Sequence, residues 1–150
     1  MLWRAIFAFL ALPGIVAFAV PLMLARDHFK PLRAWTIGLL PLVGGSFLLL
    51  YCVREFYVAG RGTLAPWAPP QHLVTSGPYR YSRNPMYVGV ATILIGWSIF
   101  FHSMLLAIYA LCVVIGFVAR VLFFEEPWAN RNFGDQWQQY RARVARWFYF

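Results

Sequence analysis

Charged residues are scarce in this sequence, and acidic residues are the scarcest of them. Only 12% of the 150 residues are charged, with 5 Asp and Glu against 13 Lys and Arg, whereas an average soluble domain carries roughly 25% charged residues. Hydrophobic residues make up 61% of the chain. This composition suits a lipid bilayer better than a surface that faces water, so we expect an integral membrane protein.

Cysteine is also rare, and its positions exclude a disulfide framework. Cys52 and Cys112 both lie within apolar segments, where small buried thiols are common. Together with His28, His72 and His102 they show no spacing typical of metal ligands. We therefore expect both cysteines to be packing residues, and we expect no metal site.

Long apolar runs dominate the rest of the sequence. They cover residues 2 to 25, 35 to 53, 86 to 101 and 104 to 124. A helix needs roughly 20 residues to cross about 30 Å of hydrocarbon; three runs approach this length and the third is shorter. The first run is longer than the apolar part of a cleaved signal peptide, so we expect a retained span with a bend at Pro13 and Gly14. The sequence predicts an all-α membrane bundle of about four transmembrane helices.

The net charge of +8 is explained by membrane topology and not by nucleic-acid binding, because the basic residues lie mainly at the ends of apolar runs. If the amino terminus, the 54 to 85 loop and the C-terminal tail share one side, that side carries ten arginines. The other side carries Arg26, Lys30 and Arg33. The positive-inside rule then places both termini in the cytoplasm, and we expect the inner membrane of a prokaryotic cell.

We expect one domain over residues 1 to 150, formed by a helical hairpin (1 to 59) and a second part (60 to 150). In the second part, His102 and Ser103 interrupt the apolar pattern and predict a tight turn. Asn84 and Pro85 are a typical cap and first residue of a helix. Pro127 suits the first turn of a last helix, predicted to be amphipathic and to lie on the membrane. Its aromatic residues are Trp128, Phe133, Trp137 and Tyr140, and Arg131, Arg141 and Arg143 are interleaved with them.

Two clusters need more than a structural explanation. The stretch TSGPYRYSRNPMYVG, residues 75 to 89, contains three tyrosines and two arginines that a turn and a cap do not require. Glu125 and Glu126 lie where the fourth apolar run ends, and carboxylates there are costly unless they are hydrated, paired or bound to a cation. Pairing with Arg120 and a role in ligand binding are equally compatible with this position. Rings near carboxylates would suit a ligand with positive charge and a planar ring.

These residues also carry a family resemblance. The order HLVTSGPYRYSRNPMYVG, an apolar hairpin and then EEPWANRNFGDQWQQYRARVARW resembles the isoprenylcysteine carboxyl methyltransferases and the related phospholipid methyltransferases. The resemblance covers about residues 60 to 147. Relative to the family pattern, Asn84 replaces a histidine and Arg120 is shifted by one residue.

The resemblance implies an enzyme that binds S-adenosylmethionine on the cytoplasmic side, between the last two spans, the preceding loop and the C-terminal segment. By position, the cofactor-binding residues would be Gln71, His72, Leu73, Val74, Tyr79, Arg83, Asn84, Pro85, Met86, Tyr87 and Glu125. Arg120 and Glu126 would take part in substrate binding and catalysis. A carboxylate acceptor needs no general base, whereas an amine acceptor would need His72 or a glutamate.

The expected function is therefore methyl transfer from S-adenosylmethionine to a lipophilic acceptor, either an isoprenylcysteine-like carboxylate or another prenylated or lipid molecule. One alternative is a phospholipid N-methyltransferase. Another is an oxidoreductase that resembles the membrane sterol reductases and binds a nicotinamide cofactor. The third is a non-enzymatic accessory protein whose Arg and Tyr residues serve as interfacial anchors. The expected partners are the lipophilic substrate and membrane lipids, without nucleic acid, and the sequence leaves the oligomeric state open.

Overall fold

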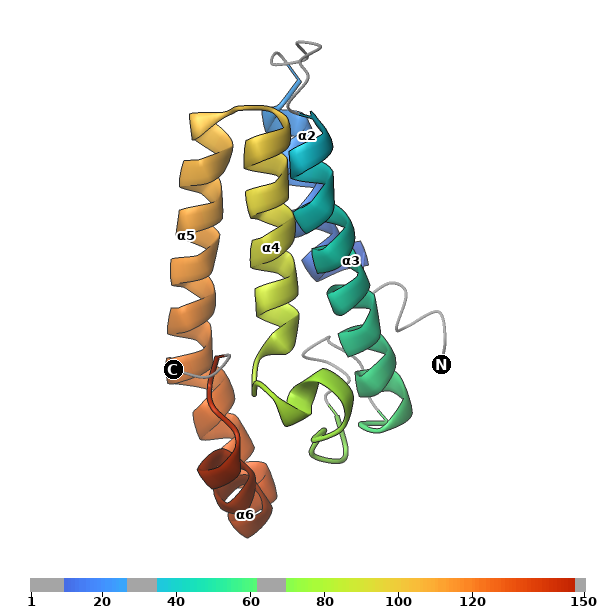
Figure 1. Ribbon diagram of the computed structural model, residues 1–150. Coiled ribbons are helices and arrows are strands. Elements are labelled where there is room, and N and C mark those ends of the chain that lie inside the picture. Colours follow the sequence, from blue (N-terminus) through green and yellow to red (C-terminus); the bar gives the residue numbers. More distant parts are fainter. Residues whose placement is uncertain (1–9, 27–34, 62–69, 148–150) are drawn as a thin grey trace.

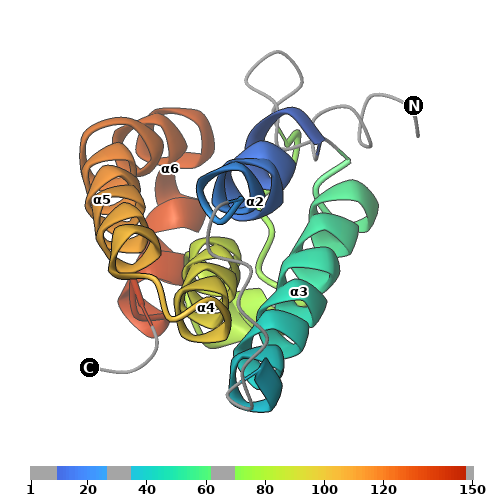
Figure 2. The ribbon, with the colours of Figure 1, turned by 90° about the horizontal axis from the view of Figure 1, so that it is seen from above.

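The computed structural model describes residues 10 to 26, 35 to 61 and 70 to 147, and every regular element in these ranges is a helix. The elements are η1 (Leu10–Ala19), α2 (Val20–Leu24), α3 (Trp35–Val58), η2 (Gly77–Arg80), α4 (Pro85–Phe100), α5 (Met104–Arg120), η3 (Val121–Glu125) and α6 (Glu126–Arg143). Figure 1 shows α3, α4 and α5 side by side, with α6 extending beyond the end of α5. Seen along the bundle, η1 and α2 lie between α3 and α5, where η1 contacts α4 and α2 contacts α5 (Figure 2). The predicted all-α class is confirmed.

All four predicted apolar runs form helices in their described parts. Two helices, Ile37–Val58 and Met104–Arg143, are long and apolar enough to cross a membrane, while Pro13–Leu24 and Pro85–Phe100 are shorter apolar helices. Many large apolar side chains of α3 and α5 are exposed on the outside of the bundle. This is the arrangement that a hydrocarbon environment favours. Cys52 is buried as expected, but Cys112 is exposed on α5.

Helices α3 and α4 make the closest contact of the bundle, and glycines allow it. A Cβ atom on Gly45 would lie 2.7 Å from the carbonyl oxygen of Gly89 and 2.9 Å from the backbone nitrogen of Ile93. A Cβ atom on Gly96 would lie 2.8 Å from the backbone nitrogen of Leu42. Small residues at such positions let two backbones approach closely, which is a common way for helices to associate in membranes.

Replacing Gly45 with alanine is expected to lower the stability of the bundle. The added methyl group meets backbone atoms of α4, so the two helices must separate, at a cost of about 1 to 3 kcal/mol. Gly44 is a matched control, because a Cβ atom there has no neighbour within 4 Å. Thermal unfolding of the purified protein in detergent should show a lower midpoint for Gly45→Ala than for Gly44→Ala. Equal midpoints would contradict the close approach.

Two backbone carbonyl groups of η1 accept hydrogen bonds from side chains of the other helices. The indole nitrogen of Trp97 donates to the carbonyl of Ala17 at 2.8 Å, and the hydroxyl of Tyr109 donates to that of Val16 at 3.1 Å. Pro21 has no N–H, so it leaves one carbonyl of the preceding turn without a backbone donor. Side chains of α4 and α5 therefore bond to the part of the first helix where a donor is missing. The expected bend region, Pro13 and Gly14, lies within π-helical η1.

The α4–α5 hairpin turns at the predicted residues. His102 is exposed and adopts a positive φ of 48°, a conformation found mostly in turns. Ser103 is buried and caps α5, with its side-chain oxygen accepting a hydrogen bond of 3.4 Å from the amide of Leu106.

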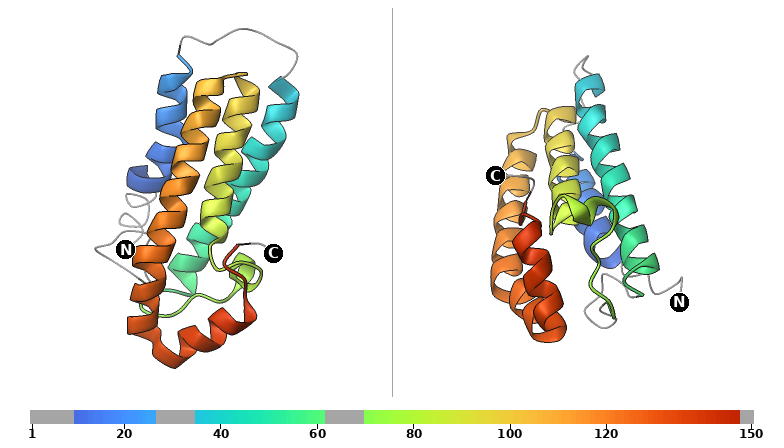
Figure 3. Two further views of the ribbon diagram at one scale, coloured as in Figure 1. Left: turned by 90° about the vertical axis from the view of Figure 1, so that its left-hand side faces the viewer. Right: turned by 60° about the horizontal axis from the view of Figure 1, so that its bottom comes forward.

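The opposite end of the bundle carries residues 70 to 84 and α6. Glu55 of α3 is buried and accepts a hydrogen bond from Ser76, which attaches this loop to α3. Glu55 also accepts a hydrogen bond of 3.0 Å from Arg54, its neighbour on α3. Gly134 interrupts α6 with φ 48° and ψ −119°, so the second half of α6 turns back toward the loop. Both views of Figure 3 show α6 folding under the bundle in this way.

Candidate functional site

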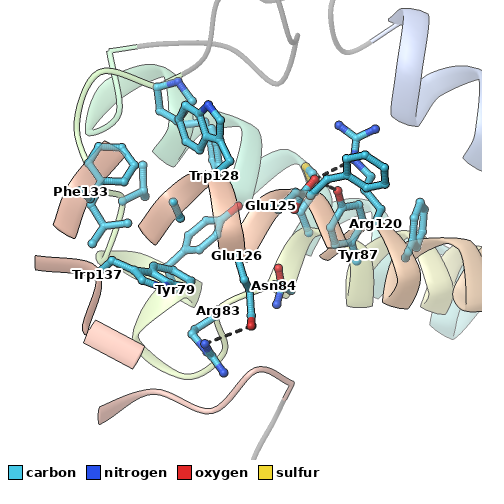
Figure 4. A pocket seen from close by; sticks show the side chains of 18 of the residues that line it. Tyr79, Arg83, Asn84, Tyr87, Arg120, Glu125, Glu126, Trp128, Phe133 and Trp137 are labelled. Carbon is cyan, nitrogen blue, oxygen red and sulfur yellow. Dashed lines mark hydrogen bonds and ion pairs between the residues drawn. The ribbon is translucent and has the colours of Figure 1, made fainter. Parts of the chain in front are cut away.

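A cavity of about 700 Å³ lies where α4, α5, η3, α6 and the 70 to 84 loop meet. This volume is within the range of roughly 300 to 1,000 Å³ that is typical of small-molecule sites. Its apolar lining residues include Val16 of η1 and Phe117, Phe123 and Phe124 of α5 and η3. Its other lining residues include the rings and charged groups labelled in Figure 4.

Glu125 lies at the centre of one charged corner of the cavity. Arg120 Nε is 2.7 Å from Glu125 Oε1, and the hydroxyl of Tyr87 donates to the same oxygen. The pairing of Arg120 with Glu125, which the sequence left open, is therefore present. These two residues are five positions apart, and the π-helical turn of η3 brings them together, since its hydrogen bonds join residues i and i+5. The Arg120 and Glu125 side chains are 47% and 36% exposed, so this pair is accessible to a ligand.

Glu126 lies in a different, more enclosed corner. Arg83 Nη1 is 3.1 Å from Glu126 Oε1, and Arg146 donates to both carboxylate oxygens at 2.8 and 3.0 Å. The side chains of Arg83 and Glu126 are only 8% and 13% exposed. Burial opposes the ionisation of Glu126, but the hydrogen bond from Arg146 and the charges of Arg83 and Arg146 hold the pKa of its carboxyl below the ordinary value. Such a carboxylate is a weak base, so this environment favours a structural role over the expected catalytic one.

The aromatic residues of α6 line the cavity. Trp128, Phe133, Trp137 and Tyr140 are all lining residues, and Trp137 and Tyr140 are buried. The hydroxyl of Tyr140 donates to the carbonyl of Tyr79 at 2.7 Å. The kink at Gly134 turns the second half of α6, with Trp137 and Tyr140, toward the loop. The position of α6 on the membrane stays a prediction.

Tyr79 contributes its ring to the same wall. It is 5% exposed, and its ring centroid lies 5.4 Å from that of Phe56 on α3. Burial raises the pKa of the Tyr79 hydroxyl well above its ordinary value, so this group stays neutral at physiological pH. Tyr81 and Arg80, from the same stretch, are exposed and do not line the cavity.

Three buried donor atoms beside the cavity have no hydrogen-bond partner in the part of the chain that the structure describes. They are the indole nitrogen of Trp137 and the Nε and Nη1 atoms of Arg83; Nη1 lies at ion-pair distance from Glu126. The Arg83 guanidinium lies 5.5 Å from the centroid of the Trp137 ring, a cation–π contact. Buried donors are normally satisfied, so this corner fits a ligand that carries acceptor atoms.

Most of the residues predicted for the site surround this one cavity. The lining includes His72, Leu73, Val74, Tyr79, Arg83, Asn84, Met86, Tyr87, Arg120, Glu125 and Glu126. Gln71 is exposed and Pro85 is buried at the start of α4, and neither is among the lining residues. Asn84 precedes α4 as predicted, but its side chain does not cap the helix. It donates instead to the carbonyl of Arg146 at 3.0 Å.

The sequence did not indicate every residue of the site. Arg146 was counted only as a basic residue of the tail, and Val16, Phe117, Phe123 and Phe124 only as parts of apolar runs. No local pattern distinguishes an apolar residue that faces a cavity from one that faces lipid. For Arg146, the available signal was an excess of arginines near a carboxylate pair.

Parts of the chain are similar in sequence to known proteins. The sequence model of a family described as phospholipid methyltransferase matches residues 34 to 136. Protein-S-isoprenylcysteine O-methyltransferase A of Arabidopsis thaliana is 34% identical over 73 residues, which is 49% of this chain and 37% of that protein. Protein-S-isoprenylcysteine O-methyltransferase of Schizosaccharomyces pombe is 32% identical over 72 residues, 48% of this chain and 30% of that protein. The chain thus matches about a third of the length of these relatives. No solved structure matches at a comparable level of significance.

Proposed function

This chain belongs to the phospholipid methyltransferase family, and we propose that it transfers a methyl group from S-adenosylmethionine to a lipophilic acceptor within a membrane. The observation that carries this proposal is a cavity whose lining combines two kinds of side chain. Carboxylates, arginines and the rings of α6 line it together with the apolar residues Val16, Phe117, Phe123 and Phe124. A polar nucleoside cofactor and a lipid-like acceptor need both kinds of contact.

The polar and aromatic residues of the lining fit the cofactor. The Trp137 ring is 6% exposed and its N–H has no partner among the described residues, so it can donate to a ligand. Glu125 is accessible and can accept hydrogen bonds from hydroxyl or amino groups. The rings of Tyr79 and Trp128 provide surfaces for a planar base. S-adenosylmethionine, when bound here, supplies an activated methyl group on its sulfonium sulfur.

The chain itself has to position the reactants and exclude water. Holding two reactants in a productive geometry is worth about 7 to 11 kcal/mol. Rings from α6 line the cavity, and Phe117 and Phe124 add apolar surface to it. An acceptor with an apolar tail would enter between η1 and α5, which both contribute lining residues. We place all four apolar runs in the membrane and both termini in the cytoplasm, which puts the cavity at the cytoplasmic surface.

The charges around the cavity favour an acceptor with a carboxylate. Arg83, Arg120 and Arg131 line the cavity, and both glutamates are paired with arginines. This environment attracts an anion, and both carboxylates among the described lining residues are already paired, which leaves neither of them free as a base for a protonated amine. A phospholipid amine is the second candidate, favoured by exposed His72 at the rim and by the family's description.

Two measurements test the proposal. The purified protein should bind S-adenosylhomocysteine saturably and should not bind NADPH. Native membranes that contain the protein should incorporate label from methyl-labelled S-adenosylmethionine into a lipid fraction, and the label should be released by base if it is a methyl ester. Preference for NADPH would support the reductase alternative, and binding of neither compound would support an accessory protein.

A further inference from the structure

We propose that residues 144 to 147, here called the C-terminal strap, hold the aromatic wall of α6 shut over the bound nucleoside, and that Arg146 sets how fast this ligand leaves. This inference rests on the proposed function, because it assigns an exchange step to the same site. Arg146 acts in it as a positioning residue, since its partner is Glu126 and not the ligand.

The backbone of the strap is attached to the loop that precedes α4. The amide of Arg83 donates to the carbonyl of Ala145 at 2.9 Å. The carbonyl of Arg146 accepts from the hydroxyl of Ser82 at 3.2 Å and from the amide group of Asn84 at 3.0 Å. Three hydrogen bonds thus join the strap to three consecutive residues of the loop.

The Arg146 side chain adds a connection to the start of α6. Its Nε and Nη2 atoms donate to the two oxygens of Glu126, in a bidentate contact of 2.8 and 3.0 Å. Bidentate arginine–carboxylate pairs are both strong and geometrically specific. Glu126 also pairs with Arg83, so one carboxylate joins the loop, α6 and the strap.

What the strap positions is the second half of α6. The strap follows directly after α6, and the amide of Val144 donates to the carbonyl of Tyr140 at 3.0 Å. This half carries Trp137 and Tyr140, which are buried against the loop and line the cavity. It is separated from the first half by Gly134, whose positive φ of 48° is open to glycine at little cost.

Gly134 can serve as the hinge of this wall. A Cβ atom at Gly134 would meet no atom within 4 Å, so the space beside this residue is open. When the strap is attached, the Trp137 and Tyr140 rings stay against the loop. When the strap is released, the wall can turn about Gly134 and expose the ligand. The residence time of the bound nucleoside is then controlled by the bonds of the C-terminal strap, whose residues do not contact this ligand.

The test compares Arg146→Met with Arg146→Lys and with the control Arg143→Met. Arg143 is exposed at the end of α6 and does not line the cavity. Hydrogen exchange of the Arg83 amide, read from peptides covering the 82 to 87 region, reports strap attachment without any ligand. Exchange within the middle of α4 reports whether the fold is intact. Stopped-flow displacement of S-adenosylhomocysteine gives its dissociation rate.

We expect Arg146→Met to accelerate exchange at Arg83 and to raise the dissociation rate about tenfold or more, as loss of a bidentate pair implies. Arg146→Lys should lie between the wild type and Arg146→Met, and Arg143→Met should match the wild type. If Arg146→Met frees the Arg83 amide but leaves the dissociation rate unchanged, the strap does not retain the ligand and the inference is wrong. If the wild-type protein does not bind S-adenosylhomocysteine, the proposed function fails, and this inference fails with it.

Discussion

Replacing Glu125 with glutamine is expected to weaken S-adenosylhomocysteine binding by about 10- to 100-fold. Hydrogen bonds to a charged acceptor are worth about 1.5 to 3 kcal/mol, and each 1.4 kcal/mol is a factor of ten. Glutamine keeps the shape of the side chain and can still accept the hydrogen bond from Tyr87. It removes the charge that pairs with Arg120. Isothermal titration of the detergent-solubilised protein measures the effect.

The stability of Glu125→Gln should stay close to that of the wild type. The Arg120–Glu125 pair is substantially exposed, and pairs of this kind contribute roughly 0 to 1 kcal/mol. Asp135→Asn is the matched control, because Asp135 is an exposed acidic residue of α6 that does not line the cavity. If both variants lose the same affinity for S-adenosylhomocysteine, the loss comes from removing any one negative charge and not from the position of Glu125 in the cavity.

Replacing Arg83 with methionine is expected to destabilise the protein by about 2 to 3 kcal/mol. Removing one partner of a buried ion pair leaves an uncompensated charge and costs up to about 3 to 5 kcal/mol, but Arg146 stays on Glu126 and lowers this cost. Methionine retains an apolar stem beside Trp137, so most of the packing is kept. Arg80→Met is the control, since Arg80 is exposed on the same loop.

The effect of Arg83→Met should depend on pH in a defined direction. The pKa of Glu126 is held below its ordinary value in the folded protein, so the stabilisation exists above the unfolded pKa of about 4.3 and is lost as pH falls through the folded value. The stability difference between wild type and Arg83→Met should therefore be constant near neutral pH and shrink below about pH 4. Unfolding midpoints measured across this range test it; a difference that grows on acidification would contradict the assignment.

The parts of the fold that depend on local sequence could be predicted. Apolar runs of helical length, Pro85 at the start of a helix and the polar pair at 102 and 103 in a turn are signals carried by neighbouring residues. The clustering of Tyr79 and Tyr87 near Glu125 could be inferred as well. The two tyrosines come at the start of the α4–α5 hairpin and Glu125 comes after its end, and neither a turn nor a helix cap requires these residues.

Features that depend on contacts between distant segments could not be predicted. The direction of α6 is set by one positive φ at Gly134, and a glycine alone does not reveal its backbone angles. Asn84 looked like a cap, but a carbonyl 62 residues away competes for its side chain. Arg146 becomes part of the site only because α6 folds back. The sequence around Pro21 did not indicate that Trp97 of α4 and Tyr109 of α5 would donate hydrogen bonds to carbonyl groups of η1.

The most direct test of the central claim is a structure determined with S-adenosylhomocysteine bound. We predict the ligand in the cavity between Tyr79 and Glu125, with an acceptor atom within hydrogen-bond distance of the Trp137 indole nitrogen. Density for the ligand outside this cavity, or a bound ligand that contacts neither Tyr79 nor Glu125, would contradict the claim that one site at the end of the bundle holds the nucleoside.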